Sequence, residues 1–348
     1  MRYLDIDTDK KISKIGLGTY QFGSREWGYG EQYARQEALA IVHRALELGV
    51  TLFDTAEIYG FEVRSVVCEA LRRGVAVTDP DRSSGFGRGE QILGQAIGGS
   101  RASAFLATKF YPAMPAAPVV ERHAVASAGR LRTDRLDLYQ VHQPDHLIRG
   151  GTVMRGIAAL QRAGMVDEVG VSNGSLDDWR AAEDALGNRV LSNQVGYSLV
   201  ARSAEQQLLP FAESHHRLII AHSPLARGLL SGKYTSANPP ANPVRASTPL
   251  FLPHNLERAG RLIKALREVA DAHDATPAQV ALAWVIRRPN VAAIPGASSV
   301  EQLERNVAAA DIDLTDGEYH ALQAASAEFH PVPGPRSLPG RIRALVGH

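Results

Sequence analysis

The stretch Thr51-Leu-Phe-Asp-Thr-Ala-Glu-Ile-Tyr-Gly60 decides the fold, because a short apolar run in it ends at a carboxylate and a phenol follows closely. Phe105-Leu-Ala-Thr-Lys109 and Leu138-Tyr-Gln-Val-His142 repeat the arrangement, each with an apolar run that ends at a basic side chain. Short apolar runs of this kind are typical of buried strands. The candidate catalytic residues at these strand ends are Asp54, Tyr59, Lys109 and His142.

Eight β-prone runs recur along the chain, and a helix-like segment follows each of them. Alternating strands and helices predict a parallel sheet with crossover helices. Eight such units can close into a (β/α)8 TIM barrel, an α/β fold in which the sheet has no open edge. The expected strands are 15–20, 51–54, 104–109, 136–142, 166–173, 191–197, 218–223 and 291–295.

The helix-like segments carry their own end signals. Apolar residues at helical spacing precede Gly49, Gly164 and Gly187. Glycine is favoured just past the last turn of a helix, so these three positions mark expected helix ends.

The alternative fold is a doubly wound open sheet, which normally carries Gly-x-Gly-x-x-Gly between its first strand and helix. Here the first strand supplies only Gly16-Leu-Gly18-Thr, without the third glycine. The run Gly85-Phe-Gly87-Arg-Gly89 lies outside any strand-to-helix turn. The barrel is therefore the favoured fold.

Four regions stand outside the strand–helix repeat. Residues 1–14 are expected to form a short hairpin that caps the barrel bottom, and the proline-rich residues 234–256 are expected to form a long loop. Residues 62–85 are an insertion after the second strand, predicted as an amphipathic helix followed by a loop. We expect a single barrel domain over residues 1–330, followed by a tail rich in proline and arginine over residues 331–348.

Composition excludes several classes of protein. Hydrophobic residues make up 45% of the 348 residues, charged residues 22%, and the net charge is +1. Such a balance is ordinary for a globular protein and offers no global field for nucleic acid or an anionic membrane. No apolar run reaches bilayer length, and a single cysteine, Cys68, fits a reducing compartment. We expect a cytoplasmic protein that binds neither nucleic acid nor membrane; its oligomeric state stays open.

The four candidate residues suit proton donation to a carbonyl oxygen. Adjacent parallel strands lie about 4.8 Å apart, so residues that end strands two, three and four can converge. Lys109 would lower the pKa of the Tyr59 phenol by its charge, and Asp54 would hold that ammonium in place. His142 would hydrogen-bond the substrate oxygen. Hydride from a nicotinamide is the natural complement to such an acid.

Each residue has a plainer interpretation when it is taken alone. Asp54 could cap a helix, Tyr59 and His142 could be packing residues, and Lys109 could be solvated. Four chemically matched residues at the ends of three successive strands favour a joint role. His142 and His146 have metal-like spacing but no shared helix face, so we expect no metal site.

The sequence resembles the aldo-keto reductase family over nearly its whole length. The segments 16–19, 53–60, 107–109 and 141–142 match its active-site motifs. The segments 170–173, 193–194, 223–233 and 294–298 match its cofactor motifs. The resemblance implies a (β/α)8 barrel that binds NADP(H) without a Rossmann domain and transfers hydride to a small-molecule carbonyl substrate, with Tyr59 as the acid.

The resemblance also implies where the cofactor would bind. Ser172, Asn173 and Gln194 would hold the nicotinamide carboxamide. Residues of 223–233 would line the pyrophosphate path, and residues of 296–306 would surround the adenosine 2′-phosphate and adenine. The full expected set is Gly18, Thr19, Tyr20, Ser172, Asn173, Gln194, His222, Ser223, Pro224, Leu225, Ala226, Gly228, Lys233, Gly296, Ser298, Gln302, Arg305 and Asn306.

Three departures from the family pattern bear on function. His222 stands where the family usually has an aromatic residue that stacks on the nicotinamide. The adenine segment lacks the usual basic residue, for which Arg305 could substitute. The third departure is the 62–85 insertion, a surface helix in the plainer interpretation and, in our hypothesis, a segment that shapes the substrate pocket.

Three functions compete at this point. The first is an NADPH-dependent reductase of aldehydes or small ketones. The second is an NADP(H)-binding regulatory subunit resembling the β subunits of potassium channels, which need not keep all four catalytic residues. The third is an unrelated barrel isomerase or aldolase with Lys109 as a Schiff-base amine, against which the cofactor motifs argue.

Overall fold

The computed structural model describes residues 1–24, 27, 31–60, 86–111, 117–143 and 151–333. Within them, eight parallel strands pair in sequence order from β1 to β8. Their bounds are β1 (Leu17–Gly18), β2 (Leu52–Asp54), β3 (Phe105–Phe110), β4 (Leu136–Val141), β5 (Val166–Ser172), β6 (Ser192–Gly196), β7 (Leu218–His222) and β8 (Val291–Ala293). All eight expected strands are confirmed.

The sheet closes on itself between its first and last strands. Bridges join Ile15 to Ala293 and Gly18 to Gly296, both parallel. The Gly16 amide donates to the Ala293 carbonyl at 2.8 Å. A parallel sheet that closes in this way, with helices between successive strands, is a (β/α)8 barrel.

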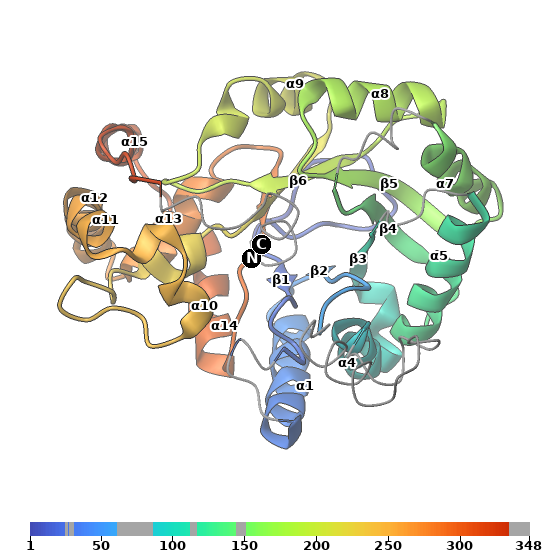
Figure 1. Ribbon diagram of the computed structural model, residues 1–348, viewed down its shortest axis with the longest axis horizontal. Coiled ribbons are helices and arrows are strands. Elements are labelled where there is room, and N and C mark those ends of the chain that lie inside the picture. Colours follow the sequence, from blue (N-terminus) through green and yellow to red (C-terminus); the bar gives the residue numbers. More distant parts are fainter. Residues whose placement is uncertain (25–26, 28–30, 61–85, 112–116, 144–150, 334–348) are drawn as a thin grey trace, which may run out of the picture.

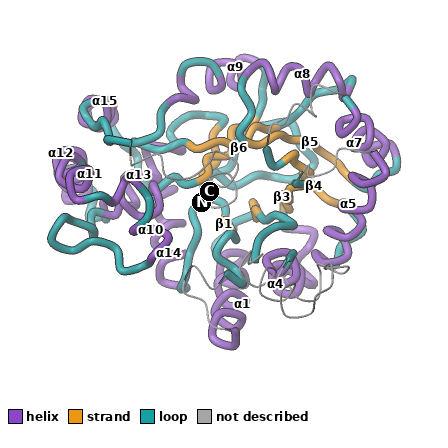
Figure 2. The backbone as a smooth tube through the Cα atoms, viewed as in Figure 1, coloured by secondary structure: helices purple, strands orange, loops and turns teal. Residues whose placement is uncertain are grey.

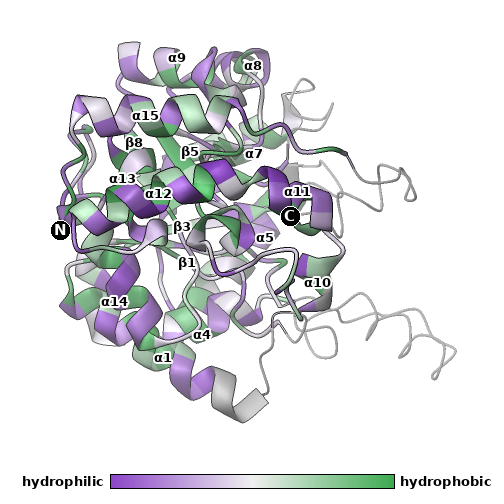
Figure 3. Ribbon diagram, turned by 90° about the vertical axis from the view of Figure 1, so that its left-hand side faces the viewer, coloured by the Kyte–Doolittle hydropathy of each residue, from purple (hydrophilic) through white to green (hydrophobic). Residues whose placement is uncertain are grey.

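Helices surround the strands on all sides in Figures 1 and 2. The longer ones are α1 (Glu31–Glu47), α4 (Arg88–Ile97), α5 (Ala117–Leu131), α7 (Thr152–Arg162), α8 (Leu176–Leu186), α9 (Leu208–Ser214), α12 (Gly260–Ala272), α13 (Pro277–Ile286), α14 (Val300–Ala308) and α15 (Asp316–Ala327). The shorter ones are η2 (Gly98–Ser103), η3 (Ser203–Glu205), η4 (Ala226–Ser231), α10 (Pro243–Ala246), η5 (Pro249–Phe251), α11 (Pro253–Arg258) and η6 (Ala309–Asp311). Hydrophilic and hydrophobic residues alternate along α12 and α15 in Figure 3, as expected for helices with one face on a core.

No helix in the described part of the chain has the length and apolar character to cross a bilayer.

The expected helix ends are confirmed. Gly49, Gly164 and Gly187 have positive φ angles of 79°, 72° and 72°. Each lies just beyond α1, α7 or α8, in the left-handed conformation that a glycine adopts without steric cost.

Two apolar clusters fill the barrel. The larger lies between the strands and the surrounding helices. The smaller fills the barrel interior, with Leu52, Phe105, Leu138, Leu218 and Ala292 among its members. Toward the carboxyl ends of the strands the interior becomes polar, with Asp54, Lys109, Gln140, Ser172 and Gln194 all buried.

The N-terminal hairpin is present, since Tyr3 and Ser13 pair antiparallel and the Leu4 amide donates to the Ile12 carbonyl at 2.8 Å. It lies at the amino ends of the strands, where Lys10 pairs with Asp137 at the start of β4. Figure 3 shows the N-terminus at one end of the molecule and α10 and α11 toward the other.

Residues 234–256 are not one long loop, as the sequence suggested. They contain α10, η5 and the first part of α11. Buried Asn255 stabilises this segment, because its side-chain amide donates to the carbonyls of Pro249 and Val332 at 2.7 and 3.0 Å. The 62–85 insertion, with Cys68, and the tail beyond residue 333 lie outside the described residues.

Candidate active site

Asp54, Lys109 and Tyr59 form one hydrogen-bonded group at the carboxyl ends of β2 and β3. The Lys109 ammonium donates to Asp54 Oδ1 at 2.6 Å, to the Thr55 carbonyl at 2.8 Å and to the Tyr59 hydroxyl at 3.0 Å. Three acceptors therefore take the three ammonium protons. The structure thus brings these three of the four candidate residues together.

Tyr59 is placed by the turn that follows β2. Its amide donates to the Ala56 carbonyl at 3.0 Å, and its carbonyl accepts from the Gly89 amide at 3.3 Å. Tyr59 is 8% exposed, whereas Asp54 and Lys109 are each 1% exposed. Of the three residues, Tyr59 is thus the most exposed.

The electrostatics of this group differ from the sequence prediction. Burial, the Asp54 carboxylate and Tyr20 together raise the pKa of Tyr59 well above its ordinary value. Burial raises the pKa of Asp54 and lowers the pKa of Lys109, against the mutual attraction of the pair. The sequence predicted a net lowering of the Tyr59 pKa by Lys109; in the protein without substrate the net shift is upward, because burial and the Asp54 carboxylate outweigh the ammonium.

His142 lies beside Tyr59. Its ring lies edge-on to the Tyr59 ring with centroids 6.0 Å apart, and edge-on to Tyr111 at 6.1 Å. Tyr20 meets the other side of Tyr59 at 5.1 Å, and Trp27 packs on Tyr20 at 5.7 Å. Tyr20 and His142 therefore flank the Tyr59 ring, and Trp27 and Tyr111 in turn pack on these two residues.

The residues expected to hold a carboxamide form a second polar group beside the first. The Ser172 hydroxyl donates to the Gln194 carbonyl at 3.1 Å, and the Asn173 amide nitrogen donates to Ser172 Oγ at 3.1 Å. The Gln194 side chain donates to Asp54 Oδ2 at 2.7 Å. Gln194 thus joins this polar group to the group that contains the phenol.

The segment after β7 has an unusual backbone. Ser223, Ala226 and Gly228 have positive φ angles of 52°, 49° and 97°. Leu225 is partly buried and Lys233 is exposed. Strained loops of this kind are frequent at ligand sites, which fits the expected pyrophosphate path.

The expected adenine end lies between β8 and α14. Ser298 donates to Gln302 Oε1 from its amide at 3.0 Å and from its hydroxyl at 2.9 Å, and the Asn306 side chain donates to the Gly296 carbonyl at 3.3 Å. Arg305 is exposed in the last turn of α14.

Gly18 and Thr19 lie beside this end and connect it to the phenol group. A Cβ on Gly18 would come within 2.7 Å of the Ile294 carbonyl oxygen, so only glycine fits. The Thr19 hydroxyl donates to the Asp54 carbonyl at 2.9 Å. The expected cofactor residues thus lie at the ends of β1, β5, β6 and β7, in the segments after β7 and β8, and on α14.

Sequence reasoning missed Glu57. This carboxylate is fully buried, accepts from the Tyr111 amide at 2.7 Å and contacts His123 Nδ1 at 2.6 Å. It thereby holds the segment that carries Tyr111 against His142. The available signal in the sequence was a glutamate between the apolar residues Ala56 and Ile58.

Arg227 and Arg245 were also missed. The Arg245 guanidinium lies 4.9 Å from the Trp27 ring centre and donates to the Arg227 carbonyl at 3.0 Å. Arg227 donates to Thr248 at 2.9 Å. Neither arginine pairs with a carboxylate within the described ranges, so both guanidinium groups can attract an anionic ligand. The signal available in the sequence was the presence of these two arginines after the expected strand 218–223.

The residues present fit a nicotinamide dinucleotide. Oriented amide and hydroxyl groups at the ends of β5 and β6 suit a carboxamide, and the guanidinium groups after β7 suit phosphates. Within the described part of the chain, no group of three or more His, Cys, Asp or Glu is arranged to hold a metal ion.

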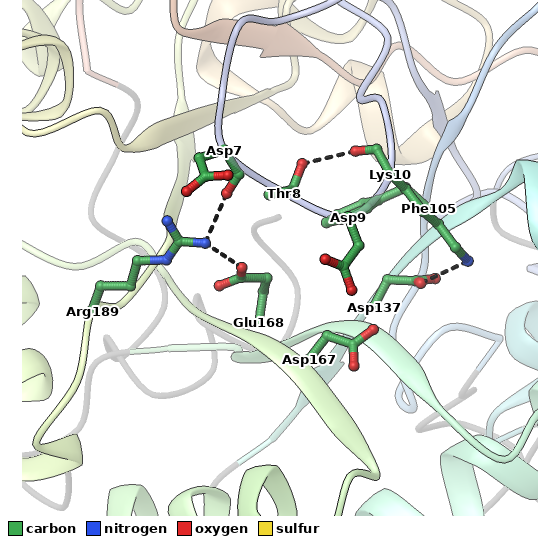
Figure 4. Close-up of a pocket in the computed structure, with 9 residues that line it drawn as sticks. All are labelled: Asp7, Thr8, Asp9, Lys10, Phe105, Asp137, Asp167, Glu168 and Arg189. Atoms are coloured by element: carbon green, nitrogen blue, oxygen red, sulfur yellow. Dashed lines mark hydrogen bonds and ion pairs between the residues drawn. The ribbon is translucent and has the colours of Figure 1, made fainter.

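A separate cavity of about 300 Å³ lies at the opposite end of the barrel, between the N-terminal hairpin and the starts of β3, β4 and β5. Figure 4 shows its charged lining, in which Arg189 contacts Glu168 and the Asp7 carbonyl, and Lys10 contacts Asp137. Barrel enzymes carry their chemistry at the carboxyl ends of the strands, so this cavity belongs to the structural end of the molecule.

A (β/α)8 barrel with a buried Asp–Lys pair beside a tyrosine and a histidine defines a class of reductases. The Aldo/keto reductase family model matches residues 14–327, and the chain belongs to this family.

Relatives and solved structures agree with this assignment. The chain is 48% identical over 346 residues to an uncharacterized oxidoreductase of Mycobacterium tuberculosis, which covers 99% of both chains. It is 28% identical over 326 residues to the methylglyoxal reductase of Escherichia coli, covering 93% of this chain and 94% of the relative. An aldo/keto reductase of Klebsiella pneumoniae, solved in complex with NADP and acetate, has a TM-score of 0.71 and 27% identity, with 97% of each chain covered. The glycerol dehydrogenase of Gluconobacter oxydans has a TM-score of 0.79 and 25% identity, covering 97% of this chain and 99% of the other.

Proposed function

We propose that this oxidoreductase uses NADP(H) to reduce the carbonyl groups of aldehydes or small ketones, with Tyr59 as the general acid. The observation that carries the proposal is the Lys109 ammonium, which bridges Asp54 Oδ1 and the Tyr59 hydroxyl at 2.6 and 3.0 Å. Within this group, the phenol is the side chain that Tyr20 and His142 flank, with ring centroids 5.1 and 6.0 Å away.

Each site residue would have a separate role in proton transfer. A bound NADPH would supply the hydride to the carbonyl carbon. The raised pKa keeps Tyr59 protonated until negative charge develops on the substrate oxygen, which is a stronger base than a phenolate. The Lys109 ammonium then stabilises the phenolate, since it already donates to that oxygen. His142 would hydrogen-bond and orient the substrate oxygen.

The residues on β5 and β6 would bind the nicotinamide. Ser172, Asn173 and Gln194 would hold its carboxamide through their amide and hydroxyl groups. Because Gln194 also donates to Asp54, cofactor binding and the acid group share a side chain. Tyr20, Trp27 and Tyr111 provide apolar walls, which favours substrates with an aromatic or aliphatic group beside the carbonyl.

The test is the oxidation of NADPH by the purified protein with an activated aromatic aldehyde, compared with Tyr59→Phe. We expect kcat to fall at least about 100-fold in Tyr59→Phe, because the variant keeps the ring and removes the proton. Tyr3→Phe, at the far end of the barrel, is the matched control and should keep wild-type activity.

Two outcomes contradict the proposal. Equal turnover by Tyr59→Phe and the wild type would exclude Tyr59 as the acid. Tight NADPH binding without turnover on a broad carbonyl panel would favour the regulatory subunit instead.

A further inference from the structure

His222 contacts Asn173, one of the residues proposed to hold the carboxamide. His222 ends β7, and Asn173 follows β5 in the left-handed conformation with a φ of 58°. The imidazole Nε2 lies 3.0 Å from Asn173 Oδ1. A residue at the position where relatives stack a ring on the nicotinamide therefore also makes a polar contact with a neighbouring side chain.

The hydrogen bonds around Asn173 are consistent with only one orientation of its side-chain amide. The Ser172 hydroxyl gives its proton to the Gln194 carbonyl, so Ser172 Oγ accepts from the Asn173 amide nitrogen at 3.1 Å. The His142 carbonyl, 3.5 Å from the same nitrogen, can only accept. The amide nitrogen of Asn173 therefore faces Ser172 and His142, and its oxygen faces His222.

This orientation of the Asn173 amide determines which ring nitrogen of His222 carries a proton. An amide oxygen only accepts, so His222 Nε2 carries a proton and donates it. The other ring nitrogen, Nδ1, lies 3.3 Å from Ser223 Oγ and can accept from that hydroxyl.

We propose that His222 is a positioning residue for cofactor recognition: its Nε2–H holds the Asn173 oxygen as an acceptor for the NH2 of the nicotinamide carboxamide. Both protons on the Asn173 nitrogen are directed to Ser172 and His142, so the oxygen is the part of this amide that offers a further bond. The inference rests on the proposed use of NADP(H).

Gly196 supports this arrangement from the neighbouring strand. It pairs with His222 in the β6–β7 ladder, and a Cβ at Gly196 would lie 3.3 Å from His222 Cε1. The absence of a side chain there lets the imidazole lie close to the strand, within reach of Asn173.

The experiment compares binding of NADP+ with binding of its 3-acetylpyridine analogue, in which a methyl group replaces the carboxamide NH2. Dissociation constants from the quenching of tryptophan fluorescence give a ratio for each protein. The two ligands share all other groups, so changes elsewhere in the site cancel in this ratio.

We expect the wild type to prefer NADP+. His222→Phe keeps a flat ring that can stack and removes the donor, so the preference should fall about five- to tenfold. His222→Gln, whose amide nitrogen can replace Nε2, should keep the wild-type ratio within about twofold. If His222→Phe does not fold, His222→Met provides the variant without a donor.

An unchanged ratio in His222→Phe, or in His222→Met, would overturn the inference. Equal weakening of both ligands would assign stacking alone to His222 and would overturn it as well. Failure of the wild type to bind NADP+ would instead contradict the proposed function and would remove the basis of this inference.

Discussion

Two buried tyrosines outside the site differ in whether their hydroxyl has a partner. Tyr139 on β4 is fully buried and its hydroxyl has no partner among the described residues, whereas the Tyr197 hydroxyl donates to Glu205 Oε1 at 3.0 Å. A buried hydroxyl without a partner destabilises the folded state, and a hydrogen bond to a carboxylate stabilises it.

We therefore expect opposite effects of removing these hydroxyl groups. Tyr139→Phe should leave the free energy of unfolding unchanged or raise it by up to about 1 kcal/mol. Tyr197→Phe, the matched control, should lower it by about 1.5–3 kcal/mol. Urea unfolding measures both, and a loss of stability in Tyr139→Phe as large as that in Tyr197→Phe would contradict the prediction.

The interactions of individual residues were the least predictable feature of the site from the sequence. The types and places of Asp54, Tyr59, Lys109 and His142 followed from strand ends. The direction of the Tyr59 pKa shift did not, because it depends first on burial, which the tertiary structure decides. The bond from Gln194 to Asp54 joins residues 140 positions apart and has no local signal.

At the scale of elements, α4 and α5 approach closely at one glycine. A Cβ on Gly94 in α4 would lie 2.6 Å from the carbonyl oxygen of Arg130 and from Leu131 Cα, both main-chain atoms of α5. Main-chain atoms cannot rotate away, so a methyl group must separate the helices.

Gly94→Ala should consequently lower the free energy of unfolding by about 1–3 kcal/mol, despite the better helix propensity of alanine. A Cβ on Gly129 in α5 would meet no described atom within 4 Å, so Gly129→Ala should stabilise by about 0.5–1 kcal/mol. Thermal and urea unfolding of the two variants provide the comparison. Similar changes in both would show that the contact with α5 does not decide the effect.

Strands and long helices were predictable because their signals are local. Apolar runs of strand length and glycines past the helix ends lie within a few residues of the element that they define. The short helices α10 and α11 were not predicted, since contacts such as Asn255 with Val332 stabilise them from a distant part of the chain. In a proline-rich segment such as residues 234–256, short helices leave no clear pattern in the sequence.

Across the whole molecule, the two ends of the barrel carry different kinds of polar group. The amino ends of the strands carry an ion-pair group around Asp137, which is 2% exposed and contacts Lys10 at 2.8 Å and Arg101 at 2.7 Å. Its Oδ2 also accepts from the Leu106 amide at 2.8 Å. The proposed chemistry lies at the other end of the same strands.

Asp137→Asn should therefore lower the free energy of unfolding by about 3 kcal/mol, because two cations lose a buried partner. The kcat/KM of the remaining folded enzyme should stay within about twofold of the wild type. Asp9→Asn, which removes an exposed partner of Arg135, is the control and should cost less than about 1 kcal/mol. A large loss of kcat/KM in Asp137→Asn at a temperature where the variant is folded would contradict the separation of the two ends.

The sequence by itself determined the barrel and the positions of Asp54, Tyr59, Lys109 and His142 at or after strand ends, because strand runs, helix ends and the residue at each strand end are encoded locally. The tertiary structure alone decided how these groups act on one another. Closure of the sheet brings Gln194 to Asp54 and His222 to Asn173, and burial raises the pKa of Tyr59. Such effects depend on distances between strands that are far apart in the chain and on the exclusion of water, and neither is written in a local pattern.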